Sequence, residues 1–196
     1  MALEGLHHVT AITADAPRNV DFYAACSADI PPEHALQGFA GVRAHSSRPP
    51  ASARLLGALG FVPEGGDGDW VLAGEQRHAR WGYDQPPPAP GVQGAGSIHH
   101  VALSAPGDAE LSHLRTVAAA AGARPTPIID RGHFHSVYVR KPSGVLHELA
   151  TRDVGFTVDE PLESLGHGLM LPAPRESRRA QLERELTPIT NPRPAP

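Results

Sequence analysis

Two pairs of adjacent histidines stand far apart in the sequence but in the same local pattern. The stretch GLHHVTAIT covers residues 5–13 and the stretch SIHHVALSA covers residues 97–105, and each pair is followed by an apolar alternation. Histidine is a common metal ligand, and two histidines with one carboxylate hold Fe(II) in many enzymes that activate oxygen. The repeat therefore favours a metal site with His8 and His100 as ligands.

A carboxylate that could complete this set lies in the run GVLHELAT at residues 144–151. Glu148 is charged within an otherwise apolar strand pattern, and a buried glutamate is costly unless it is paired or binds a metal. We expect it on a strand next to those of the two histidines. The alternative is that the histidine pairs are ordinary strand residues whose ring nitrogens form hydrogen bonds within the protein.

A repeated order of strands and helices would position these side chains. Apolar alternation predicts a strand over residues 5–13, and Pro17 suits the first turn of a short helix after it. The second histidine pair opens a longer version of the same pattern. Its strand runs to about residue 105, Asp108 is expected to cap a helix that ends at Gly122, and three short strands follow, the first over residues 124–129.

Two complete β-α-β-β-β units follow from this pattern, over residues 38–84 and 97–153. The first of them carries Gly41 at the position that matches His8 and His100. Such units must pair to bury their sheets. We therefore expect an α+β fold, in which repeated β-α-β-β-β modules form a cupped mixed sheet or barrel around a metal site.

Three strands of the opening module are missing from the pattern. The expected organisation is a first strand and helix of a truncated module (1–26), a connector (27–37), a complete module (38–85), a linker (86–96), a second complete module (97–153) and a C-terminal extension with a helix (154–196). Either the module at 38–85 packs against the last module and accepts the first strand at its edge, or a second chain completes the barrel. An unpaired edge strand invites pairing, so we expect a homodimer.

Composition narrows the class of protein. The chain has 196 residues, of which 40% are hydrophobic and 19% charged, and this balance is typical of a globular protein. The net charge of -4 argues against nucleic-acid and membrane partners. A single cysteine, Cys26, excludes an internal disulfide framework and favours a reducing cytoplasm.

The chain resembles the vicinal oxygen chelate superfamily, and within it the hydroquinone-type ring-cleaving dioxygenases. The resemblance is carried by both histidine stretches, by DRGHFHSVYVRKPSGVLHELATRDVGFTVDEPLESLG at residues 130–166, and by LMLPAPRESRRAQLERELTPI at residues 169–189. It implies that His8, His100 and Glu148 bind Fe(II).

The resemblance also implies residues around the metal. They are Arg131, Tyr138, His7, His99 and Thr10. Tyr138 would form a hydrogen bond with a substrate oxygen or exchange a proton with it. Arg131 would stabilise developing negative charge, and His7 and His99 could carry protons. Strand alternation turns His7 and His99 away from the ligands, so their role rests on the resemblance alone.

Together with the candidate metal site, the resemblance implies an Fe(II)-dependent dioxygenase that opens the ring of a hydroquinone-like or phenolic substrate with O2, in the degradation of aromatic compounds. One alternative keeps the metal site but uses Mn, Zn, Ni or Co in a glyoxalase-like isomerase or lyase. Another is a non-catalytic small-molecule binding or resistance protein of the same superfamily.

Overall fold

The structure, a computed structural model, describes residues 3–15, 18, 39–65, 68–75, 77–86, 88–89 and 91–189. It divides into two compact units: Met1–Ile12 with Gly38–Asp153, and Thr13–Gln37 with Val154–Pro196. Apart from residue 18, the helix expected after the first strand lies outside the described residues, and so does the connector at residues 27–37. Every residue expected in the site belongs to the first unit.

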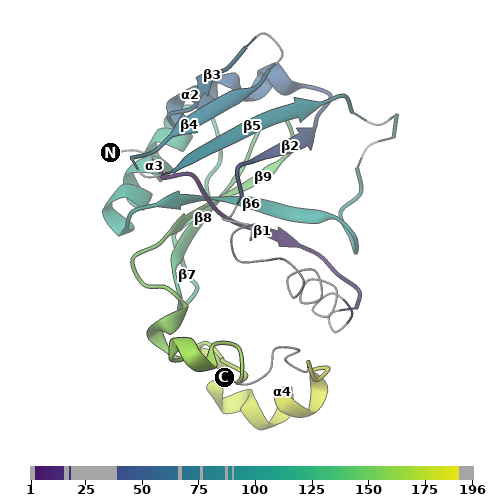
Figure 1. The fold of residues 1–196 in the computed structure, drawn as a ribbon, viewed down its shortest axis with the longest axis vertical. Helices are drawn as coiled ribbons and strands as arrows, with labels where there is room; N and C mark the ends of the chain where they lie inside the picture. The colour runs from purple at the N-terminus through teal and green to yellow at the C-terminus, as the bar shows by residue number, and fades with distance from the viewer. Residues whose placement is uncertain are drawn as a thin grey trace, which may run out of the picture. The chain divides into compact units, whose positions relative to one another are not determined.

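The first unit contains two mixed sheets that do not close into a barrel (Figure 1). One sheet has the strand order β1-β6-β9-β8-β7 and the other the order β2-β5-β4-β3. The strands are β1 (Leu6–Ala11), β2 (Gly41–His45), β3 (Val62–Pro63), β4 (Trp70–Ala73), β5 (His78–Asp84), β6 (Ile98–Ala105), β7 (Ile129–Asp130), β8 (His135–Arg140) and β9 (Leu146–Thr151). Of the two arrangements expected from the sequence, the structure therefore has mixed sheets, and the closed barrel is wrong.

Two helices interrupt the strand sequence at the expected places. A 3₁₀ turn, η2 (Pro49–Ser52), and helix α2 (Ala53–Ala58) follow β2, and helix α3 (Asp108–Ala120) follows β6. The order strand, helix, three strands therefore occurs twice, and the α+β class is confirmed. The module boundaries expected from the sequence stay a prediction.

The ends of α3 test two sequence expectations. Gly122 lies just beyond the helix with φ +92°, a left-handed conformation that ends helices and suits glycine. The cap expected at Asp108 is wrong: Gly107 occupies that position and Asp108 is the first helical residue. Its carboxylate instead contacts Nδ1 of His135, 2.6 Å away.

The strand expected over residues 124–129 is also wrong for most of its length. Only Ile129 and Asp130 form β7, which pairs with β8. Pro125 and Pro127 have no N–H to donate to a neighbouring strand, so this segment cannot form a regular ladder.

The first strand does not join the module at 38–85. β1 pairs antiparallel with β6, at the edge of the sheet formed by the last module. Backbone hydrogen bonds extend this pairing at both ends, from Glu4 N to Ser104 O and from Ile12 N to Ser97 O. An edge strand offers unpaired N–H and C=O groups, and β6 is the edge that β1 completes.

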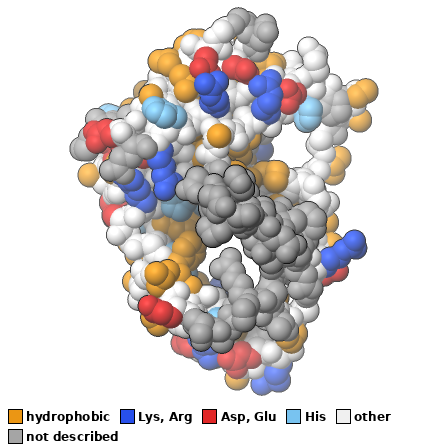
Figure 2. All heavy atoms as spheres, viewed as in Figure 1, with side chains coloured by type: hydrophobic (Ala, Val, Ile, Leu, Met, Phe, Trp, Pro, Cys, Tyr) orange, Lys and Arg blue, Asp and Glu red, His pale blue; other side chains and the backbone are white. Residues whose placement is uncertain are grey.

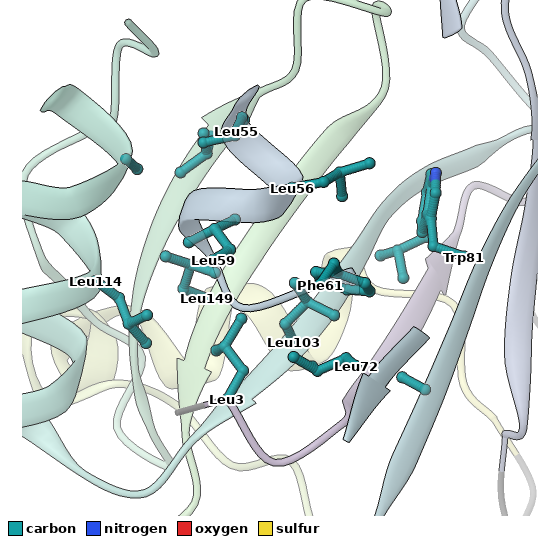
Figure 3. Packing of buried hydrophobic residues seen from close by; sticks show 14 of the residues in the cluster. Leu3, Leu55, Leu56, Leu59, Phe61, Leu72, Trp81, Leu103, Leu114 and Leu149 are labelled. Carbon is teal, nitrogen blue, oxygen red and sulfur yellow. The ribbon is translucent and has the colours of Figure 1, made fainter. Parts of the chain in front are cut away.

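A shared hydrophobic core holds the first unit together. The side chains labelled in Figure 3 come from both sheets and both helices and converge between them. Helix α3 contributes Leu111, Leu114 and Ala118, which are buried and recur at helical spacing. The core uses one face of the five-stranded sheet, which leaves the other face for polar side chains.

Gly41 stands where the other two modules have a histidine because no side chain fits there. A Cβ at this position would lie 2.7 Å from the carbonyl oxygen of Arg80 on the paired strand β5. We expect Gly41→Ala to lower the free energy of unfolding by about 2 kcal/mol, since backbone must move.

Gly57 in α2 is the matched control for this substitution. A Cβ there meets nothing within 4 Å. Gly57→Ala is expected to raise stability by up to about 1 kcal/mol through helix propensity. Urea unfolding of both variants measures the difference, and equal effects at the two positions would contradict this account of Gly41.

The second unit is described over residues 13–15, 18 and 154–189. It contains the 3₁₀ turns η3 (Phe156–Val158), η4 (Leu162–Ser164) and η5 (Ala173–Arg178), and the helix α4 (Arg179–Glu185). Glu160 accepts hydrogen bonds from the backbone N–H groups of Gly166 and Gly168. Arg179 pairs with Glu176 and donates to the carbonyl oxygen of Leu169, so polar contacts organise this unit.

Charges of both signs are mixed on the face shown in Figure 2, where acidic and basic side chains lie together over the four-stranded sheet. Arg43 contacts Asp69 and Asp84, and Arg80 contacts Glu64. In the part of the chain that is described, no helix has the length and apolar character needed to cross a membrane.

Candidate metal centre

One face of the five-stranded sheet gathers the expected metal ligands. In the strand register, His8 of β1 lies opposite Ala102 of β6, which lies opposite Glu148 of β9. Thr10, two residues after His8, lies opposite His100. Opposed residues share a face, and so do residues two apart on one strand. Three neighbouring strands therefore each present one ligand to the same side.

The three ligand atoms meet at one point. Nε2 of His8 lies 3.0 Å from Oε2 of Glu148, and Nε2 of His100 lies 2.9 Å from the same oxygen. The two Nε2 atoms are 3.0 Å apart. Among the described residues, these side chains form the one group of three that could hold a metal ion.

The spacing of these atoms fits a metal ion. Two ligands at right angles on an ion, each about 2.1 Å from it, lie about 3.0 Å apart. The observed separations of 3.0, 2.9 and 3.0 Å match this facial arrangement on all three edges. Two imidazoles and one carboxylate arranged in this way leave further positions on a transition metal open.

Glu148 is an anion in a buried place. Its side chain is 1% exposed, and no described residue gives either carboxylate oxygen a well-aligned hydrogen bond. Burial raises the pKa of Glu148, but contacts with His8 and Ser136 and the charge of His100 outweigh burial, and the pKa falls to about 2. A buried anion without a full set of hydrogen bonds needs a compensating cation, and a bound metal would supply it.

The first histidine of each pair turns toward the site, so the expectation from strand alternation is wrong. Nδ1 of His7 lies 2.7 Å from Nδ1 of His8, and Nδ1 of His99 lies 2.7 Å from Nδ1 of His100. Each of these rings therefore contacts Nδ1 of a candidate ligand, the ring nitrogen on the side away from the metal position.

Two β-bulges cause this arrangement. In the register between β1 and β6, His7 of β1 and His99 of β6 have no paired residue on the other strand. A bulged residue has lost its partner across the ladder, and its side chain is aimed differently from a regular strand residue. The first histidine of each pair therefore lies at a β-bulge, one on β1 and one on β6.

His7 makes a second hydrogen bond, from its Nε2 to the carbonyl oxygen of Thr151, 3.1 Å away. Burial lowers the pKa of His7, and the neighbouring His8 lowers it further. Burial also lowers the pKa of His100, against the opposing charge of Glu148. Both lowered pKa values favour the neutral ring, the form in which imidazole binds a metal.

Tyr138 and Arg131 form a pair beside the ligands. Tyr138 lies opposite Glu148 in the sheet, and its ring centroid is 5.3 Å from that of His100. Arg131 donates a hydrogen bond to the phenol oxygen, 3.0 Å away. Burial raises the pKa of Tyr138, and the charge of Glu148 adds to this effect and outweighs Arg131, so the phenol keeps its proton at neutral pH.

Two residues near the ligands were not expected from the sequence. The ring centroid of Phe134 lies 5.4 Å from that of His7 and 5.7 Å from that of His8. Ser136 is fully buried, and its hydroxyl helps to lower the pKa of Glu148. Phe134 and Ser136 precede Tyr138 by four and two residues, so alternation along this strand could have found them.

The sheet topology and the three convergent side chains that could hold a metal ion indicate a class of protein. The chain belongs to the vicinal oxygen chelate superfamily, as its repeated modules predicted. It is 34% identical over 165 residues to "Putative ring-cleaving dioxygenase MhqO" of Bacillus subtilis strain 168, an alignment that covers 82% of this chain and 53% of that relative. It is 31% identical over 176 residues to the chlorohydroquinone/hydroquinone 1,2-dioxygenase of Sphingobium indicum, with coverage of 80% and 51%.

Structure comparison agrees with sequence comparison. The crystal structure of a "putative dioxygenase" from Bacillus subtilis superposes with a TM-score of 0.73 at 32% identity, and covers 83% of this chain and 54% of that one. No family model matches the sequence. The chain spans about half the length of the curated relatives it matches, so their activity is extended to it only as a proposal.

Proposed function

We propose that this protein is an Fe(II)-dependent ring-cleaving dioxygenase that acts on a hydroquinone-like or phenolic aromatic. The observation that carries the proposal is the right-angle spacing of His8, His100 and Glu148, the donor set that non-haem Fe(II) oxygenases use. The names of the relatives, ring-cleaving dioxygenase and hydroquinone 1,2-dioxygenase, support the choice of reaction and substrate.

The reaction breaks one carbon–carbon bond of the ring and places both atoms of O2 in the product, and the electrons that O2 gains come from the ring. Bound Fe(II) would supply a redox-active Lewis acid at the three ligands. Tyr138 keeps its phenol proton, and Arg131 donates a hydrogen bond to the phenol oxygen. The phenol O–H is therefore available to donate a hydrogen bond to a substrate oxygen. Arg131 adds a fixed positive charge beside that oxygen.

The remaining residues shape the place for the substrate. Phe134 offers an apolar ring next to His7 and His8, against which an aromatic ring can pack. Thr10 lies on the ligand face opposite His100 and has a hydroxyl for a second polar contact. His99 lies against His100 and could pass a proton to the opened ring.

We also propose that the active form is a homodimer. The expected opening module has only its first strand and helix, and β1 adds this strand to the last module. A second copy could then contribute a further wall to the site. Native mass spectrometry of the iron-loaded protein reports both the iron content and the number of chains.

Anaerobic reconstitution with Fe(II), followed by oxygen uptake with hydroquinone, tests the proposal. We expect one iron per chain and consumption of one O2 for each hydroquinone, with a ring-opened product by mass spectrometry. Metal uptake with turnover of a hemithioacetal but no oxygen consumption would instead identify an isomerase. Binding of hydroquinone without metal uptake would identify a non-catalytic binding protein, and either result would overturn the dioxygenase assignment.

A further inference from the structure

We propose that His7 is a positioning residue that fixes the tautomer and orientation of the ligand His8 by linking it to the backbone of β9. This role rests on the proposed function, since it concerns the same metal site. It differs from the proton-carrying role that the sequence suggested for His7.

The hydrogen-bond partners of His7 determine where its proton lies. A carbonyl oxygen can only accept, so Nε2 of His7 must carry the hydrogen that is donated to Thr151. In the neutral ring, Nδ1 of His7 is then the acceptor, and Nδ1 of His8 must donate to it across 2.7 Å. With a metal in the site, this leaves the lone pair of His8 on Nε2, the atom that lies with the other two candidate ligand atoms.

The anchor at the far end of this chain is rigid. Thr151 is fully buried and is the last residue of β9, the strand that carries Glu148. Its hydroxyl accepts a hydrogen bond from the backbone N–H of His135 on β8. The residue whose carbonyl accepts from His7 is therefore buried in β9 and bonded through its hydroxyl to β8.

This link ties β1 to the sheet at a second place. In the described structure β1 pairs with one strand, β6, and two bulges interrupt that pairing. The contact from His7 crosses β6 and reaches β9, 144 residues away in sequence. The bulge that removes His7 from the ladder is what allows its ring to span this distance.

The other pair lacks such an anchor. His99 contacts Nδ1 of His100 as His7 contacts His8, but no described residue accepts a hydrogen bond from the remaining nitrogen of His99. His8 is therefore the ligand whose tautomer the fold sets from the backbone. Loss of a hydrogen-bond partner of this kind, which acts through a metal ligand, commonly lowers metal affinity by about one to two orders of magnitude.

The test measures metal affinity and the tautomer of His8 in the same variants. His7→Phe keeps the ring shape and the packing against Phe134 but removes both hydrogen bonds. His7→Asn returns an acceptor close to the position of Nδ1. His113→Phe, on the exposed side of α3, is the control for loss of a histidine. Competition with a chromophoric chelator gives the affinity for Co(II), and ¹⁵N NMR of the imidazole rings gives the tautomer.

We expect wild type and His113→Phe to bind Co(II) equally and, in the NMR samples loaded with diamagnetic Zn(II), to hold His8 as the Nδ1–H form. In His7→Phe the affinity falls by about one order of magnitude or more and the Nε2–H form of His8 is populated, while His7→Asn recovers part of both losses. Unchanged affinity and tautomer in a folded His7→Phe protein would overturn the role of His7. No Co(II) uptake by wild type would overturn the proposed function instead, and the NMR spectrum would still decide the tautomer.

Discussion

Replacing Glu148 by glutamine is expected to weaken metal binding by at least about two orders of magnitude, because the metal loses its one anionic ligand. Oε2 of Glu148 is the atom that both histidine ligands approach, at 3.0 and 2.9 Å. Glutamine has nearly the same shape but no charge, so the variant separates the charge from the packing. Isothermal titration with Co(II) measures the affinity, and oxygen uptake with hydroquinone should fall in parallel.

The metal-free variant is expected to fold less stably than wild type at neutral pH. In the folded protein the pKa of Glu148 is lowered to about 2, so the ionised carboxylate beside His8, Ser136 and His100 stabilises the fold above the pKa of an ordinary glutamate, and a neutral amide loses this contribution. Glu110→Gln is the matched control, since Glu110 is also buried and has an oxygen without a partner among the described residues. Equal metal affinity in both variants would show that Glu148 is not a ligand.

The convergence of the three candidate ligands could be predicted from residue type, strand position and the family resemblance. Two histidines at matching points of a repeated pattern and one glutamate in an apolar strand were enough to select His8, His100 and Glu148, and the structure brings these three together. Whether they bind iron stays a prediction.

The orientation of His7 and His99 could not be predicted from alternation, because a bulge depends on which residue of the partner strand lies opposite. That pairing is a property of two segments about 90 residues apart, with His8 and His100 separated by 92 positions. The expectation that the first strand joins the module at 38–85, and not β6, was wrong for a similar reason. The local sequence shows an edge strand but does not say which edge it completes.

The interior between the sheets also held a feature that the sequence did not indicate. Lys141, the one lysine in the chain, lies at the start of the β8–β9 turn, where charged residues are usually exposed. It is 1% exposed, with Nζ 3.3 Å from the ring centroid of Trp81 and without a hydrogen-bond partner among the described residues. The ring of His147 packs on the same Trp81, and Tyr83 lies 5.3 Å from Nζ.

Lys141→Met is expected to stabilise the protein, and to do so more near neutral pH than in alkali. Burial lowers the pKa of Lys141 far below its usual value, and burial together with Lys141 lowers the pKa of His147 as well. The unfolded chain therefore binds a proton at Lys141 that the folded chain releases. Below the unfolded pKa of about 10.4, wild type loses up to about 1.4 kcal/mol of stability for each pH unit until the folded pKa is reached.

Methionine fills nearly the same volume without a charge, so the gain from Lys141→Met should be larger at about pH 7 than at about pH 9.5. Urea unfolding at the two pH values measures it. Arg140→Met removes the exposed charge of the preceding residue, the last of β8, and its effect should not depend on pH over this range. If the gain from Lys141→Met were the same at both pH values, the folded protein would carry Lys141 as a cation. The face of Trp81, at 3.3 Å, would then be what stabilises that charge in the interior.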